Sequence, residues 1–176
     1  MNNTINTINH FIKLLTLKSR PQNLHYSILN FSILLGAFFI LISYVTSQMD
    51  TADLPAQMQK IGSVITFGVI LHEAVFLTIL YFLLKRDDKT NRFIQVATNF
   101  VGIDLAECLL SLFIGKIALG FYVLCALKAW LLVIKLHVTR HAFDVSIARA
   151  AWLFITVSIS SVIIAAMTIT FFSSSV

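Results

Sequence analysis

The chain has 176 residues, of which 58% are hydrophobic and only 12% are charged, and its mean hydropathy is +0.88. Soluble domains contain roughly 45–50% apolar and about 25% charged residues, so this composition indicates a single-domain integral membrane protein. The formal net charge is +5. Because the basic residues gather at the ends of apolar stretches, the charge indicates membrane orientation, and we expect no nucleic-acid partner.

The N-terminal segment, residues 1–25, precedes the first apolar stretch. Phe11, Leu14 and Lys18 lie at helical spacing, which predicts a short interfacial helix with its apolar side toward lipid and its cations toward the headgroups. Pro21 is expected to end this helix, because the residue before a proline is disfavoured in the α region. A disordered basic tail is the alternative. The apolar run that follows is too long for a cleavable signal peptide, so we expect none.

Five apolar stretches follow, each close to the length of about 20 residues with which a helix crosses a bilayer. None alternates with the period of two that is typical of a membrane β-strand. The expected fold is therefore an all-α polytopic membrane bundle in residues 26–172, followed by a short tail, residues 173–176. The expected spans are residues 26–47, 62–84, 93–114, 117–136 and 147–172.

Small residues at four-residue spacing indicate where these helices pack closely. Such steps begin at Ser32 in the first span and at Thr98 in the third, and the fifth span is rich in small and hydroxyl residues. The helix-packing residues predicted on this basis are Gly36, Gly102, Ala106, Ser161 and Ala165.

Ionisable residues lie near the middle of three consecutive apolar stretches. A charge at the bilayer centre costs roughly 2.5–3.5 kcal/mol on insertion scales, so these side chains are expected to face one another or a wet cavity rather than lipid. Two of them, Asp104 and Glu107, are three residues apart and share one face of a helix. The candidate site, a buried polar cluster or proton relay, comprises His72, Glu73, Asp104, Glu107 and Lys128.

The charges of this cluster do not balance, because three carboxyl groups accompany one lysine. We expect Lys128 to pair with Asp104 or Glu107. One or two of the carboxyl groups are expected to be protonated, because burial and a neighbouring like charge both disfavour the ionised form. A protonated carboxyl group would then donate a hydrogen bond.

Three interpretations of the cluster stay open at this point. In the first, ion pairs and hydrogen bonds between helices fix the register of the bundle. In the second, titratable carboxylates line a path for protons or ions. In the third, His72, Glu73, Asp104 and Glu107 bind a metal, which is disfavoured because the segment His-Glu-Ala-Val-Phe lacks the second histidine of the zinc-protease pattern.

The other residues that could carry chemistry favour no catalytic or cofactor site. Cys108 and Cys125 both lie in apolar stretches and are expected to be packing residues. His137 and His141 are four residues apart, as expected for solvated histidines on one helical face. The sequence has no nucleotide-binding glycine loop, Ser-His-Asp set or Cys-x-x-Cys pair. We therefore expect no enzymatic activity, no cofactor and no metal.

Lysine and arginine are distributed unequally between the two sides of the predicted bundle. With the N-terminus inside, the outer side carries only Lys60 and Lys116, while Lys128 lies within the membrane. This positive-inside distribution predicts a cytoplasmic N-terminus and a periplasmic C-terminus. The inner cations are Lys13, Lys18, Arg20, Lys85, Arg86, Lys89, Arg92, Lys135, Arg140 and Arg149.

A family resemblance rests on three short motifs in residues 122–172. They are Lys-Ala-Trp at 128–130, the basic connector Lys-Leu-His-Val-Thr-Arg-His at 135–141, and Ala-Arg-Ala-Ala at 148–151. Together they resemble the last two helices of Yip1-type membrane proteins, and the five-span layout is similar. Residues 20–27 resemble the entry segment of small proteobacterial inner-membrane proteins. The resemblance implies a non-enzymatic helical bundle in the bacterial inner membrane.

The function expected from the sequence is that of a scaffold, assembly or membrane-organising subunit, whose buried polar cluster holds the bundle together. Its expected partners are the lipid bilayer and either further copies of the chain or a larger membrane complex, because five short helices can shield only a small polar cluster. The alternative is a small proton- or ion-coupled transporter or channel subunit that uses Glu73, Asp104, Glu107 and Lys128.

Overall fold

The computed structural model describes residues 9–14, 16–18, 24, 27–47, 61–114 and 120–173, and these contain helices and turns but no strand. The five helices below are long and apolar enough to cross a membrane, so the all-α prediction is confirmed for this part of the chain. The predicted tail beyond residue 173 lies outside the described residues. The elements are α2 (Ile28–Ser47), α3 (Ile61–Arg86), the 3-10 turn η2 (Thr90–Arg92), α4 (Phe93–Ile114), α5 (Gly120–Phe143) and α6 (Ile147–Ser173).

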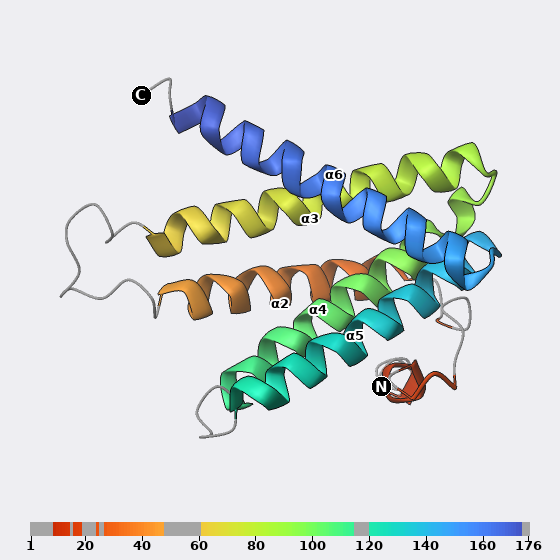
Figure 1. The fold of residues 1–176 in the computed structure, drawn as a ribbon, viewed down its shortest axis with the longest axis horizontal. Coiled ribbons are helices and arrows are strands. Elements are labelled where there is room, and N and C mark those ends of the chain that lie inside the picture. Colours follow the sequence, from red (N-terminus) through yellow and green to blue (C-terminus); the bar gives the residue numbers. More distant parts are fainter. Residues whose placement is uncertain are drawn as a thin grey trace.

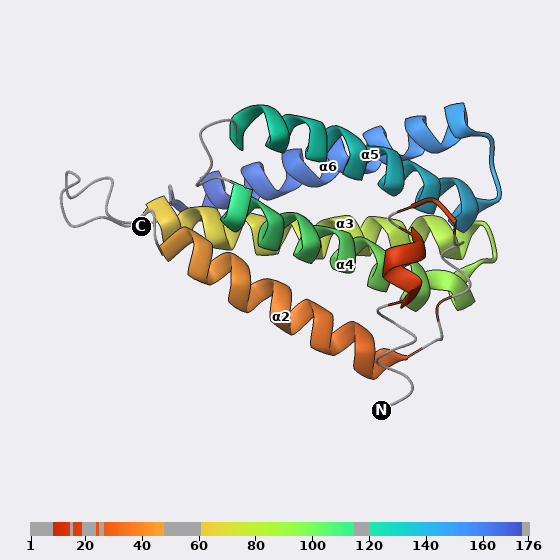
Figure 2. The same cartoon turned by 90° about the horizontal axis from the view of Figure 1, so that it is seen from below.

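The five long helices form a closed ring, in which each helix contacts two neighbours. The order around the ring is α2, α4, α5, α6 and α3, and α3 then meets α2 again. Figure 2 shows α3 and α4 between α2 on one side and the α5–α6 pair on the other. Direct contact between α3 and α4 is slight. Side chains from several helices therefore share the interior of the ring.

The apolar core lies at one end of this ring, near η2 and the α5–α6 connection. Its buried side chains come mainly from the second half of α3, the first half of α4 and the second half of α5. At the other end the helices diverge (Figure 1). Large apolar side chains are exposed there, including Phe113 at 71% and Phe121 at 73%. Such a surface fits a lipid environment much better than water.

Two helices end with an aspartate in the left-handed backbone region. Asp88 follows α3 with φ 55°, and Asp144 follows α5 with φ 54°. In each case the next backbone N–H donates to the carbonyl five residues before it, at 2.8 Å after α3 and at 3.1 Å after α5. This is the Schellman arrangement, which usually places glycine at the left-handed position. Aspartate tolerates this conformation better than most residues, so both helices stop sharply.

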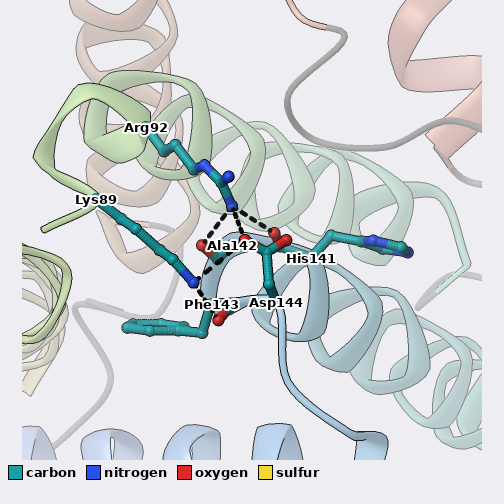
Figure 3. A network of polar contacts seen from close by, with 6 residues as sticks. All are labelled: Lys89, Arg92, His141, Ala142, Phe143 and Asp144. Carbon is teal, nitrogen blue, oxygen red and sulfur yellow. Dashed lines mark hydrogen bonds and ion pairs between the residues drawn. The ribbon is translucent and has the colours of Figure 1, made fainter. Parts of the chain in front are cut away.

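The start of α4 is fastened to the end of α5 by two cations (Figure 3). Lys89 Nζ lies 3.2 Å and Arg92 Nη1 lies 2.6 Å from Asp144 Oδ2. Arg92 Nη1 also donates to two of the last carbonyls of α5, at 3.2 and 3.3 Å, and Lys89 Nζ donates to a third. These carbonyls lack helical partners and form the negative end of the helix dipole, so both cations stabilise the helix end. The Arg92 guanidinium also holds the pKa of Asp144 below its ordinary value.

The fourth helix continues beyond the end of the span predicted for it. The span predicted from the sequence ends at residue 136, within the basic connector 135–141, whereas α5 continues to Phe143. The buried residues Ile134, Val138 and Ala142 continue one face of the helix at four-residue spacing, which stabilises it against the core despite the polar residues between them. The ends of α2, α3, α4 and α6 lie within two residues of the predicted limits.

The N-terminal segment packs against α4. Residues 9–14 are helical, and Leu14 is completely buried as part of the core cluster. His10 Nε2 lies 3.0 Å from Asn99 Oδ1. The expectation that Leu14 faces lipid is therefore wrong, because the bundle itself covers this side chain. Pro21, the predicted end of the helix, lies outside the described residues.

Candidate functional site

The acidic residues predicted to meet inside the bundle line one cavity of about 190 Å³. Glu73 lies near the middle of α3, and Asp104 and Glu107 lie near the middle of α4. The cavity is enclosed by side chains of α2, α3, α4 and α5. Its lining residues are Phe38, Ile42, Val69, His72, Glu73, Asp104, Glu107, Cys108 and Lys135.

Asp104 forms an ion pair with Lys135 of α5, not with Lys128. Both side chains of the pair are only 19% exposed. Lys135 stands in the cavity because α5 continues through the segment that the sequence analysis treats as a connector. The pair joins two neighbouring helices of the ring, and each charge has a partner that offsets part of its loss of water.

Glu107 forms the second ion pair, with Lys128 Nζ 2.6 Å from its Oε1. The prediction that Lys128 pairs with Asp104 or Glu107 is therefore confirmed for Glu107. The prediction that Lys128 is buried is wrong, because its side chain is 64% exposed. Lys128 precedes Lys135 by seven residues, or about two helical turns, and so lies nearer the end at which the helices diverge.

Among the described residues, Glu73 forms no ion pair. It is only 5% exposed, and its Oε1 is buried without a hydrogen-bond partner among the described residues. Roughly 90% or more of buried polar groups in proteins are hydrogen-bonded, so an unsatisfied carboxylate oxygen requires an explanation. Because the residue Glu73 lines the cavity, its carboxylate group is the candidate binding group of the site.

His72 connects the cavity to α6. Its Nδ1 lies 3.0 Å from Ser161 Oγ, and Ser161 Oγ donates to the carbonyl of Ser158 at 2.9 Å. A hydroxyl group has only one proton, so the His72 contact is satisfied when Nδ1 carries hydrogen and donates to Ser161. In this tautomer Nε2 of a neutral His72 is a hydrogen-bond acceptor. The site therefore has contributions from the whole ring of helices.

The charges at the site add up to one surplus negative charge. Glu73, Asp104 and Glu107 are accompanied by two lysines, each of which pairs with a different carboxylate of α4. The surplus belongs to Glu73. Since an isolated buried charge is very costly, this group must bind a proton or one positive charge. The geometry can therefore hold a single proton or a single monovalent cation.

An aromatic layer, formed by Phe76, Phe100 and Phe154, closes the cavity toward η2. Phe76 and Phe100 lie about one helical turn from Glu73 and Asp104, and they are 6% and 2% exposed. Ring centroids in this layer are 5.1, 6.2 and 6.3 Å apart. The void beside it measures only about 10 Å³, roughly the space of one water. The side chains between the cavity and η2 therefore leave little space for entry from the η2 end.

The predicted small-residue contacts have mixed outcomes. Ser161 and Ala165 are 0% and 5% exposed on α6. A Cβ atom added at Gly102 would overlap the ring of Phe11, so the N-terminal segment occupies the smooth face predicted there. Ala106 is half-buried. A Cβ atom at Gly36 would meet nothing within 4 Å among the described residues, so the close contact expected at Gly36 stays a prediction.

The sequence analysis missed Lys135 as a site residue. Its seven-residue spacing from Lys128 could have revealed that both lysines share one face of a helix. It also treats both cysteines as packing residues, but Cys108 lines the cavity and Cys125 is exposed, and neither forms a disulfide. In the part of the chain that the structure describes, no three His, Cys, Asp or Glu side chains are grouped to bind a metal.

Comparison with known protein families, curated proteins and solved structures finds no match to this chain. Its function is therefore argued from the cavity and the charges around it.

Proposed function

We propose that this protein is a multi-pass membrane transporter or channel subunit that carries a proton or a monovalent cation through the cavity beside Glu73. The observation that carries the proposal is Glu73, a buried residue that lines a cavity of about 190 Å³ and whose carboxylate oxygen Oε1 has no hydrogen-bond partner among the described residues. Ionisable groups that face a cavity within a membrane bundle commonly mark proton or ion paths. This favours the transport alternative over the scaffold function expected first from the sequence.

The two ion pairs would confine the change of charge to one residue. Asp104 is paired with Lys135, and Glu107 is paired with Lys128, so each of these carboxylates already has a cation as its partner. Glu73 alternates between a protonated, uncharged form and an ionised form that attracts a cation. Passage to the other side of the membrane requires the aromatic layer to move, which would expose Glu73 alternately to the two sides.

We place the protein in the bacterial inner membrane with a cytoplasmic N-terminus and a periplasmic C-terminus. Support comes from lysine and arginine, which are abundant at the η2 end of the ring and sparse at the diverging end, even with Lys128 and Lys135 counted within the bundle. Cytoplasmic loops carry such an excess. In this orientation the aromatic layer closes the cytoplasmic side, and the cavity opens toward the periplasm.

A scaffold or assembly function is the second candidate, and Lys128 favours it. This lysine lies in a membrane-length helix, yet its side chain is 64% exposed beside Glu107. A charge at such a position is stabilised when a further copy or another membrane protein covers it. The Yip1-like resemblance implies a non-enzymatic function of this kind, and both candidate functions are non-catalytic.

A proton-flux assay in proteoliposomes tests the proposal. With a pH-sensitive dye inside, wild-type protein is expected to dissipate an imposed pH gradient, and Glu73→Gln is expected to abolish this flux because an amide cannot carry a proton. Asp88→Asn is the matched control, since it makes the same acid-to-amide change at an exposed position outside the bundle.

The result that would contradict transport is equally clear. If wild-type protein carries neither protons nor monovalent cations, and Glu73→Gln, Asp104→Asn and Glu107→Gln only lower the yield of folded protein, the polar cluster is structural. A stable complex recovered in mild detergent would then support the scaffold function.

A further inference from the structure

The charge of the cavity limits the ligand to one positive charge. Two of its three carboxylates are already paired with lysines, so one negative charge remains on Glu73. A divalent ion would reverse the excess instead of cancelling it. A neutral ligand would leave the charge of Glu73 uncompensated in an apolar surrounding.

The ligands around the cavity favour an organic cation over a metal ion. Metal ions that prefer oxygen ligands, such as Mg²⁺ and Ca²⁺, take about six or more of them. Among the described residues, no group of three or more His, Cys, Asp or Glu side chains is arranged for a metal. An ammonium group instead requires acceptors for its N–H donors. The carboxylate of Glu73, which lines the cavity and whose Oε1 has no partner among the described residues, offers such an acceptor, and charge-assisted bonds of this kind are strong.

The walls of the cavity fit a hydrocarbon substituent. Phe38 and Ile42 of α2 and Val69 of α3 contribute apolar surface to the cavity. The volume of about 190 Å³ is more than ten times the roughly 10–15 Å³ needed to place one water. A pocket with an apolar wall and a few converging polar groups is typical of small-molecule sites.

We infer that this cavity binds a small primary ammonium ion with a short hydrocarbon chain, its –NH₃⁺ group on Glu73 and its chain against Phe38, Ile42 and Val69. This inference rests on the proposed function and names the class of cation that the site takes. The primary ammonium group donates hydrogen bonds and cancels the surplus charge, while the apolar wall selects for the alkyl chain.

The test is a binding measurement on the purified full chain in detergent, by calorimetry at constant ionic strength. Methylammonium and n-butylammonium are expected to bind, n-butylammonium more tightly because it reaches the apolar wall. Tetramethylammonium, which has no N–H donor, and sodium are expected not to bind. Glu73→Gln should weaken n-butylammonium binding at least tenfold, and Asp88→Asn should bind as wild type does.

A second variant keeps the inference testable if Glu73→Gln does not fold. Val69→Phe retains every carboxyl group and fills the apolar part of the cavity, so it should lose n-butylammonium at least tenfold and retain methylammonium. Equal binding of sodium or tetramethylammonium would overturn the inference, as would n-butylammonium binding that neither variant changes.

The same experiment separates this inference from the proposed function. Proton flux that depends on Glu73, without any binding of primary ammonium ions, would overturn the ligand assignment and retain transport. Ammonium binding without flux would retain the site and overturn transport. Repeating the titration in nanodiscs with and without phosphatidylethanolamine distinguishes a lipid ammonium headgroup from a free amine, because the lipid would compete with added n-butylammonium.

Discussion

The two lysines of the polar cluster differ in burial, and this decides how much each stabilises the protein. Lys135 and its partner Asp104 are both 19% exposed, whereas Lys128 is 64% exposed. Removing one member of a buried pair leaves an uncompensated charge, which typically costs about 3–5 kcal/mol. The long Lys128 side chain lies nearer the diverging end, where its ammonium group can reach water, and hydrated pairs of this kind contribute roughly 0–1 kcal/mol.

Lys135→Met is therefore expected to destabilise the protein by about 3–5 kcal/mol, and Lys128→Met by at most about 1 kcal/mol. Reversible denaturation in detergent measures both. Adding Asp104→Asn to Lys135→Met should recover part of the loss, since the unpaired carboxylate is removed. Equal losses from the two lysine variants would contradict the assignment of Lys135 as the interior partner.

His10 makes the attachment of the N-terminal segment sensitive to pH. Burial lowers the pKa of His10 below its ordinary value of 6.5, so the attached segment favours neutral imidazole. The stabilisation that neutral His10 gives to the attached segment is complete above pH 6.5. It decreases as the pH falls below this value, because His10 takes up a proton more readily in the detached segment. Amide hydrogen exchange over residues 9–14 should be faster at pH 5.5 than at pH 7.5 after correction for intrinsic rates. His10→Gln should remove this difference, and an unchanged difference would exclude His10 as its cause.

At the scale of elements, the two aspartate-terminated helices provide an internal comparison. Asp88 and Asp144 have nearly the same φ, but only Asp144 is paired with Arg92 and Lys89 in the described structure. Left-handed backbone costs a residue with a side chain roughly 1–2 kcal/mol, less for aspartate. Glycine relieves this cost at both positions but retains no carboxylate.

Asp88→Gly is therefore expected to stabilise the protein by roughly 0.5–1 kcal/mol, and Asp144→Gly to stabilise it less or to destabilise it. Thermal unfolding in detergent at neutral pH measures the difference. Because the pKa of Asp144 is lowered, its ionised carboxylate stabilises the folded protein fully above the ordinary aspartate pKa. This stabilisation is lost as the pH falls through the lowered value. The two variants should therefore become alike in acid, and a constant gap between them would contradict the account.

The elements also show what sequence reasoning can reach. The spans follow from composition, because long apolar runs have few alternatives to a membrane helix. The end of α5 was missed because Lys135 and His137 look like loop residues, and only tertiary packing of Ile134 and Val138 keeps them helical. The ring order places α2 beside α4, which depends on contacts between distant segments. The position of Glu73 near the middle of α3 was predictable from the sequence. Its lack of a partner among the described residues was not, because this depends on contacts between distant segments.

At the scale of the whole molecule, the ring is packed at one end and open at the other. The core and the aromatic layer close the η2 end, while the helices diverge beyond the cavity (Figure 1). We propose that this arrangement holds a polar cavity inside a membrane and opens it to water on one side. Cys108 lines that cavity, and Cys125 is exposed on α5. Once Cys125 is replaced, thiol labelling of Cys108 can report access to the cavity.

The most direct measurement is thiol labelling of Cys125→Ser protein in proteoliposomes with a charged, membrane-impermeant reagent. Cys108 is expected to react when the reagent is on the side of the diverging end and to stay unreacted when it is on the side of η2. Cys108→Ser in the same background gives the blank, and denatured protein gives full labelling. Labelling from neither side, or equally from both, would contradict a cavity that is open to water at one end.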